Sequence, residues 1–121
     1  MNFDYDPENI FAKILNGDIP CEKVLESAHS LAFRDIRPQA PTHVLVIPKG
    51  PYMSADHFCQ WASEAEIVDF MRTVGKICEA EGVEDGFRLI ANARDHGVQE
   101  VPHFHVHILA GRPLGRMLDP A

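Results

Sequence analysis

The sequence has no long hydrophobic run and no paired cysteines. No apolar stretch approaches the roughly 20 residues that a membrane-spanning helix needs. The acidic start, MNFDYDPENI, lacks the basic and then apolar layout of a signal peptide. Cys21, Cys59 and Cys78 are odd in number and form no CxxC pair, so they indicate neither a disulfide framework nor a cysteine-rich zinc site. These absences predict a cytoplasmic protein that does not enter a membrane.

Positive charge is also scarce. The chain has 11 Lys and Arg against 18 Asp and Glu, a net charge of −7. Because extended nucleic-acid binding depends on basic surfaces, a long polyanionic partner is disfavoured, whereas a small anionic ligand needs only local donors. The 121 residues contain no repeat, low-complexity tract or linker. We therefore expect a single domain over residues 1–121.

Hydrophobic periodicity predicts two helices and five strands. A short helix is expected to begin with Asp6 as N-cap and Pro7 in its first turn, and to end at Gly17. A longer helix is expected over 63–81, with Ile67, Phe70, Met71, Val74, Ile77 and Cys78 on one side. Residues 50–62 are not assigned, residues 93–100 are expected to be a polar loop, and 110–121 an ordered tail. Strands are expected over 23–27, 31–36, 42–49, 87–92 and 102–110, which gives an α+β fold with a mostly antiparallel sheet.

The last expected strand carries three alternating histidines in the sequence VPHFHVHILAG. In a strand, alternate side chains share a face, so His103, His105 and His107 would project together, about 6.6 Å apart. Phe104, Val106 and Ile108 would then point to the opposite face, toward the core.

Three interpretations of this imidazole row are open on the residues alone. It could be a polar, solvent-facing side of the strand. It could bind a metal, since a His-x-His pair on a strand can chelate zinc, although a third residue in the same row lies too far away to reach one ion easily. It could also hold a nucleophile, because neutral imidazole attacks phosphorus and neighbouring imidazoles can bind phosphoryl oxygens or move a proton.

The histidine motif and several other segments resemble the histidine triad (HIT) superfamily. The motif is His-φ-His-φ-His-φ-φ over residues 103–109, where φ is apolar. NIFAKILNGDIP is similar to the N-terminal helix of the HINT branch, the nucleotide-binding phosphoramidases. LAFRDIRPQAPTHVLVIPK is similar to that branch's nucleotide-binding strand, loop and strand. RLIAN and the run into GRP also align without gaps, so the resemblance covers nearly the whole chain.

The resemblance implies a HIT fold, a ligand and an assembly. The ligand would be a purine nucleotide similar to AMP, with no cofactor and no metal. Two chains would form a homodimer whose five-stranded sheets join into a ten-stranded sheet. The tail, residues 110–121, would lie near the active site and the dimer interface.

The resemblance also implies a mechanism. His105 would attack the α-phosphorus of a nucleoside 5′-phosphoramidate or acyl-nucleotide, and water would then release AMP or GMP from the nucleotidyl-histidine. His107 would bind phosphate oxygens, and His103 would position the nucleophile and help to pass a proton to the leaving group. His43 matches a fourth histidine beside the triad, and Asn92 matches a phosphate-contacting asparagine.

Nucleoside recognition is expected from one carboxylate and an apolar slot. Asp35 can accept hydrogen bonds from two ribose hydroxyls. On the residues alone, however, Asp35 is a solvated turn residue and the helical apolar stripe is core, so only the resemblance makes these residues binding candidates. The slot for a purine base would comprise Ile10, Phe11, Ile14, Phe33 and Ile36.

The segment before the triad departs from part of the HINT pattern. Many relatives carry Gly-Gln-Ser where this chain has Val98-Gln99-Glu100. Gln99, Glu100 and Val101 are still expected to line the phosphate and leaving-group side, since related triad proteins carry Gln-Glu-Val. A carboxylate beside a phosphate is repulsive, so Glu100 is expected either to turn away or to contact a cationic leaving amine.

Two alternatives to a phosphoramidase are retained. One is a dinucleoside polyphosphate hydrolase of the same superfamily. The other is a non-catalytic module that binds a nucleotide or a metal for regulation.

Overall fold

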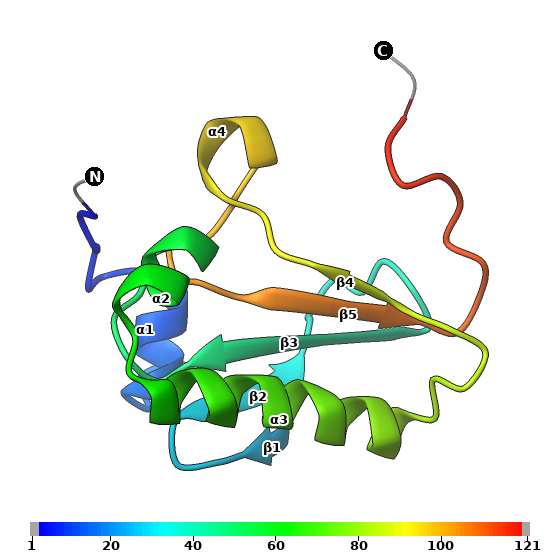
Figure 1. The fold of residues 1–121 in the computed structure, drawn as a ribbon, viewed down its shortest axis with the longest axis horizontal. Coiled ribbons are helices and arrows are strands. Elements are labelled where there is room, and N and C mark those ends of the chain that lie inside the picture. Colours follow the sequence, from blue (N-terminus) through cyan, green and yellow to red (C-terminus); the bar gives the residue numbers. More distant parts are fainter. Residues whose placement is uncertain (1–2, 120–121) are drawn as a thin grey trace.

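The computed structural model describes residues 3–119, which form a five-stranded antiparallel sheet with a long helix across one face (Figure 1). The strand order is β1-β2-β3-β5-β4. The predicted α+β class is confirmed. The elements are α1 (Ile10–Leu15), β1 (Lys23–Glu26), β2 (Ser30–Arg34), β3 (Thr42–Pro48), α2 (Ala55–Trp61), α3 (Glu64–Glu81), β4 (Arg88–Ile90), α4 (Arg94–Gly97) and β5 (Val106–Ala110).

The central strand β3 packs against a different layer on each face. Val44 and Val46 belong to the core cluster under α3, whereas Leu45 and Ile47 join Phe11 of α1 in a second cluster. Directly opposite residues of neighbouring strands share a face, and Leu45 pairs with His107 of β5. The face of the sheet toward α1 is therefore the one that carries the histidines.

Helix α3 follows the sequence prediction closely. Ser63 caps it through a reciprocal capping box with Glu66, and Gly82 ends it at φ 65°. Its expected apolar side needs one correction, because Met71 is 55% exposed while Thr73 is buried. The helix is turned so that Phe70, Thr73 and Ile77 meet the sheet.

The first helix begins three residues later than predicted. Asn9, rather than Asp6, is the N-cap, and its Oδ1 accepts a hydrogen bond from the Ala12 N–H at 2.9 Å. Asp6 instead accepts a bond from the Glu8 N–H in a preceding turn. The predicted stop is confirmed, since Gly17 follows the helix at φ 82°.

The last strand is shorter than predicted, and two of the three histidines precede it. Pairing with β3 extends only as far as Val46 opposite Val106, and β3 ends at Pro48, which has no N–H to donate. His103 and His105 therefore lie in an irregular segment held by other bonds, such as that from the Phe104 N–H to the Tyr52 carbonyl at 2.7 Å.

The unassigned and loop segments contain two short helices. Residues 50–62 include α2, and the expected polar loop 93–100 includes α4. The expected strand 87–92 is shortened to β4. None of the helices in residues 3–119 is both long and apolar enough to cross a membrane.

The tail leaves β5 through a glycine that no other residue could replace without movement. Gly111 has φ 104°, and a Cβ placed there would lie 2.6 Å from Cβ of Pro41. Arg112 then donates a hydrogen bond to the Gln39 carbonyl at 3.0 Å. The start of the tail is thus fixed against the loop between β2 and β3. Of the expected tail over 110–121, residues 120–121 lie outside the described residues, as do residues 1–2 of the acidic start.

Candidate active site

The three triad histidines occupy different environments. His103 is fully buried, His105 is 6% exposed, and His107 on β5 is half-buried. The rings of His105 and His107 meet edge to face, with centroids 5.0 Å apart. His103 contacts His105 through its backbone, because the His103 carbonyl lies 2.7 Å from Nδ1 of His105. The expected strand over 102–110, with all three imidazoles in one row, is therefore wrong, because only His107 lies in β5.

Hydrogen bonding fixes the tautomer of His105. A carbonyl oxygen can only accept, so Nδ1 of His105 must carry the proton and donate it to the His103 carbonyl. In the neutral ring, Nε2 then keeps its lone pair. The edge of the Phe11 ring lies against this imidazole, with ring centroids 5.0 Å apart and the planes perpendicular. His105 is thus held as an oriented, neutral imidazole.

The same argument fixes His43 and His107. The Gln39 N–H donates to Nδ1 of His43 at 3.0 Å, so the proton of His43 sits on Nε2. This Nε2–H lies 2.9 Å from Nδ1 of His107, which must accept. The proton of neutral His107 is then on Nε2, where it can be donated to another acceptor. Asp35 lies 3.5 Å from Nε2 of His43 and supports this arrangement by charge.

Burial keeps these imidazoles neutral near pH 7. It is the main cause that lowers the pKa of His103 to about 4 and of His107 to about 4, and the neighbouring His105 adds to both shifts. Burial also lowers the pKa of His105, opposed by its bond to the His103 carbonyl and by the charges of Asp35 and Glu100. The pKa of His43 is lowered by burial and partly restored by Asp35. A neutral ring is the form that can attack phosphorus.

Both ring nitrogens of His103 are engaged by protein groups. Nε2 donates to the Pro48 carbonyl at 2.8 Å, and Nδ1 lies 2.6 Å from the hydroxyl of Tyr5. With both nitrogens bonded in a fully buried ring, the expected passage of a proton from His103 to a leaving group has no route. The geometry favours the other half of the expected role, positioning of the nucleophile.

The expected apolar slot is only partly assembled. Phe11, Phe33 and Val101 lie together on the α1 face, and Ile14 packs against the same cluster. Ile10 is 45% exposed and Ile36 is 87% exposed, so neither is core. Exposed apolar side chains beside a buried aromatic pair suit a surface that a flat ring could cover.

The loop before the triad is tied down by Gln99. Its amide donates to the carbonyls of Met53 at 2.7 Å and Val101 at 2.9 Å, and its oxygen accepts from the Arg94 N–H. Both N–H groups of the Gln99 amide are thus used within the protein, whereas its oxygen accepts one bond and can accept a second, so its expected place among the binding residues stays a prediction. Val98 takes the left-handed conformation at φ 55° despite its branched side chain.

The remaining loop candidates lie at the edge of the site. Glu100 is exposed, and its negative charge acts to raise the pKa of His105 against the effect of burial. Asn92 is half-buried and lies against Gly97, where an added Cβ would meet the Asn92 backbone at 3.4 Å. Of the two, only Glu100 is linked to His105, through its charge.

Two contributors to the site were missed from the sequence. Tyr5 bonds His103, and Arg94 forms an ion pair with Asp56 at 2.8 Å that fastens the loop to the start of α2. Neither lies in a motif or on a periodic face. Only the three-dimensional fold brings Tyr5 to the triad and Arg94 to the start of α2.

One group of side chains has the arrangement of a metal site. Single ligand atoms of Asp35, His43 and His107 all lie within 4.8 Å of one another. A cation there would have to replace the His43–His107 hydrogen bond and displace the proton from Nε2 of His43. The residue types fit zinc, but the hydrogen bonds present satisfy the same atoms.

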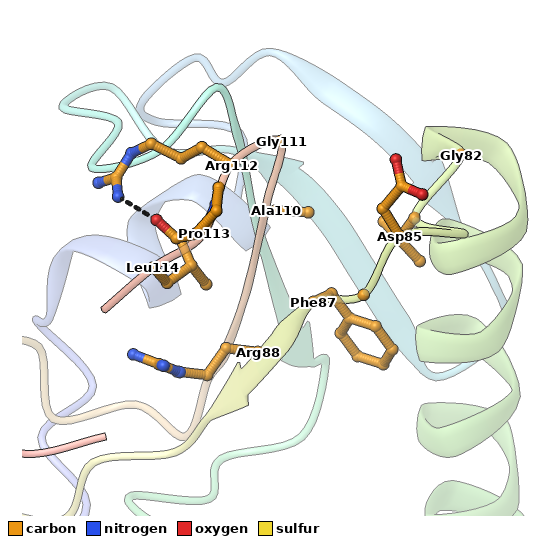
Figure 2. A pocket seen from close by; sticks show the side chains of 11 residues that line it. Gly82, Asp85, Phe87, Arg88, Ala110, Gly111, Arg112, Pro113 and Leu114 are labelled. Atoms are coloured by element: carbon orange, nitrogen blue, oxygen red, sulfur yellow. Dashed lines mark hydrogen bonds between the residues drawn. The ribbon is translucent and has the colours of Figure 1, made fainter. Parts of the chain in front are cut away.

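A separate cavity of about 540 Å³ lies between the end of α3, the start of β4 and the tail (Figure 2). Arg88 and Arg112 line it, but both guanidinium groups are bonded to backbone carbonyls of the tail or of the β2–β3 loop. None of the expected site residues lines it. This cavity therefore lies beside the start of the tail and is distinct from the histidine site.

Comparison with known proteins identifies relatives over nearly the whole chain. The model of the HIT domain matches residues 16–114. The chain is 55% identical to an uncharacterized HIT-like protein of Azospirillum brasilense over 115 residues, covering 94% of each chain. It is 46% identical to the purine nucleoside phosphoramidase of Escherichia coli over 117 residues, covering 92% of this chain and 93% of that one.

A solved structure shows the same fold. The histidine triad protein from Clostridium difficile superposes with a TM-score of 0.81 at 39% identity, covering 95% of this chain and all of that one. A five-stranded antiparallel sheet with its histidines beside the short N-terminal helix thus defines the class of protein. The chain belongs to the HIT family.

Proposed function

We propose that this protein hydrolyses nucleoside 5′-phosphoramidates or acyl-nucleotides. Nε2 of His105 attacks the α-phosphorus and the bond to the leaving group breaks, with the departing amine or acid taking up a proton from solvent where it needs one. Water then attacks the phosphorus of the nucleotidyl-histidine. The nucleoside monophosphate, AMP or GMP, leaves and Nε2 of His105 is restored.

The observation that carries this proposal is the fixed tautomer of His105. Its Nδ1–H is bonded to the His103 carbonyl at 2.7 Å, and so the lone pair on Nε2 is the nucleophile. The name of the relative from Escherichia coli, a purine nucleoside phosphoramidase, supports the same chemistry.

The other site residues supply binding. Nε2–H of His107 donates to a phosphate oxygen, since its Nδ1 is already occupied by His43. Asn92 adds a donor to the phosphate, and Asp35 accepts from the ribose hydroxyls. The base lies over Phe11 and Phe33 between the exposed side chains of Ile10 and Ile36, with Ile14 and Val101 behind them. Glu100 faces the leaving group, where its charge favours a cationic amine.

The nucleophile is tested by substitution. His105→Ala and His105→Asn are expected to lower the turnover of adenosine 5′-phosphoramidate by at least about 10³-fold, because no other group can form the covalent intermediate. Binding of AMP, measured by calorimetry, should persist. His29→Asn, at an exposed position on the β1–β2 turn, is the matched control and should retain full turnover. Turnover by the His105 variants at the level of this control would refute the mechanism.

A second candidate function rests on the cluster of Asp35, His43 and His107. A regulatory protein that binds a divalent cation there would use the same three ligand atoms, within 4.8 Å of one another. Zinc that stays at one ion per chain after dialysis, and that His43→Ala removes, would support this candidate. Turnover that is insensitive to chelators would support the hydrolase.

We further propose a homodimer in the cytoplasm. β4 is an edge strand, and alternate residues Phe87 and Leu89 are 47% and 42% exposed, which suits pairing with a second copy into a ten-stranded sheet. Light scattering would measure the mass directly. The thiols of Cys21, Cys59 and Cys78 remain unpaired, as expected in a reducing compartment.

A further inference from the structure

We propose that Tyr5 is a positioning residue of the active site, which holds His103 and, through its backbone carbonyl, the nucleophile His105. The inference rests on the proposed function, since it assigns the part that the N-terminal segment plays in that reaction. Tyr5 precedes α1 and lies 98 residues from His103 in sequence, yet its hydroxyl is 2.6 Å from Nδ1 of the His103 ring.

The direction of this hydrogen bond is fixed by the opposite side of the ring. Nε2 of His103 lies 2.8 Å from the Pro48 carbonyl, which can only accept, so Nε2 carries the ring proton. Nδ1 of the neutral ring is then an acceptor, and the Tyr5 hydroxyl must donate to it. Burial raises the pKa of Tyr5, which keeps this hydroxyl protonated.

The bonds form one directed chain that ends at the nucleophile. Tyr5 donates to Nδ1 of His103, and Nε2 of His103 donates to the Pro48 carbonyl on β3. Held from both sides, the His103 residue presents its own carbonyl to Nδ1–H of His105 at 2.7 Å. His103 and His105 precede β5, so no ladder of strand bonds fixes this segment. The side-chain bonds to His103 replace that ladder.

The N-terminal segment touches the triad a second time. The Phe11 ring contacts the His105 ring edge to face at 5.0 Å, and the Tyr5 ring meets the His103 ring in the same way at 5.5 Å. Residues 5–11 thus fix one histidine by a hydrogen bond and the next by an aromatic contact. Tyr5 bonds a ring that is itself fully buried, and so it acts on substrate only through His103.

The test is Tyr5→Phe, which keeps the aromatic contact and removes the donor. Without it, Nδ1 of His103 is a buried acceptor with no partner, and the segment that orients His105 loosens. We expect kcat for adenosine 5′-phosphoramidate to fall about tenfold, while KM changes less than about twofold. Tyr52→Phe is the matched control, because it removes a hydroxyl that donates to Glu66 on α3 and keeps the backbone carbonyl that accepts from the Phe104 N–H. Its kcat and KM should equal those of the unaltered protein.

Three kinetic results would overturn the assignment. The first is a kcat and a KM that are both unchanged in Tyr5→Phe. The second is a raised KM at constant kcat, which would mean that Tyr5 contacts the substrate directly. The third is an equal loss of kcat in Tyr5→Phe and Tyr52→Phe, which would mean a general loss of packing.

A measurement that needs no turnover separates this inference from the proposed reaction. In protein labelled with ¹⁵N-histidine, His103 should be protonated at Nε2 and hydrogen-bonded at Nδ1, and His105 protonated at Nδ1. Tyr5→Phe should shift the Nδ1 resonance of His103 and speed exchange of the Nδ1 proton of His105. Absence of both changes overturns the role of Tyr5. Failure of the unaltered protein to turn over substrate refutes only the proposed reaction.

Discussion

The two sides of the chain around β5 contribute differently, even where their side chains are equally buried. Phe104, Val106 and Ile108 lie in the apolar core under α3, while His105 on the other side is 6% exposed, almost the same as the 5% of Phe104. Burying hydrocarbon stabilises the fold, whereas burying an imidazole costs free energy that is seen as a lowered pKa. The core under α3 therefore offsets the cost of keeping the histidines neutral on the opposite face.

The largest expected effect is a loss of stability on acidification. His103 and His107 have folded pKa values of about 4, below the ordinary 6.5, so between these values the unfolded chain binds protons that the folded chain does not. The free energy of unfolding should fall as pH drops from about 6.5 to about 4, by up to about 1.4 kcal/mol per pH unit for each histidine. Urea unfolding at a series of pH values measures this slope.

A pair of variants assigns the slope to the buried rings. His107→Gln should flatten it, because one of the groups whose pKa is lowered on folding is gone. His96→Gln, at an exposed position in α4, should leave it as it is. A slope that is the same in both variants would contradict the assignment.

The next effect separates the two faces by mutation. Ile108→Ala removes a fully buried side chain from the α3 face and should cost about 2–5 kcal/mol of unfolding free energy. kcat should change little at a temperature where the variant is folded. Denaturant unfolding measures the free energy of unfolding. Val68→Ala, at a 56% exposed position of α3, is the control and should lower this free energy by less than about 0.5 kcal/mol. A large loss of kcat in folded Ile108→Ala would mean that the faces are not separable.

The smallest effect concerns the loop before the triad. Val98 is strained at φ 55°, so Val98→Gly should raise the unfolding free energy by about 1 kcal/mol, a gain limited by the entropy of glycine in the unfolded chain. Thermal unfolding detects a change of this size. Val98→Ala keeps Cβ and should gain less than the glycine variant. Equal or lower stability of Val98→Gly would show that the protein has relaxed this strain in another way.

Periodic features of the fold were predictable from the sequence. Ser63 and Gly82 bound α3 as their residue types predict, and the alternation in β3 and β5 separates the two faces. The residue at which α1 begins was less predictable, because Asn9 and Asp6 are both good N-caps and only the folded chain selects Asn9. Met71 fits an apolar stripe and is nevertheless exposed, since the sheet under α3 decides which side is buried.

The site was predictable as a set of residues but not as a set of bonds. Alternation places the three histidines in one row of a strand, but the early end of the β3–β5 ladder leaves only His107 in that strand. Whether a ring nitrogen is occupied depends on partners far away in sequence, such as Pro48 and Tyr5 for His103. No motif carries that information, so the positioning role of Tyr5 and the internal bonds of Gln99 required the structure.

The crowded contact between Gly111 and Pro41 sets a boundary for protein engineering. A side chain at 111 would push on the loop that carries Asp35 and precedes His43, because its Cβ would lie 2.6 Å from that of Pro41. Tails can therefore be exchanged between relatives from Pro113 onward, with Gly111 and Arg112 kept, because Arg112 bonds the Gln39 carbonyl of the same loop. A chimera joined upstream without this glycine would alter the β2–β3 loop together with the tail, and the effects of the two changes could no longer be told apart.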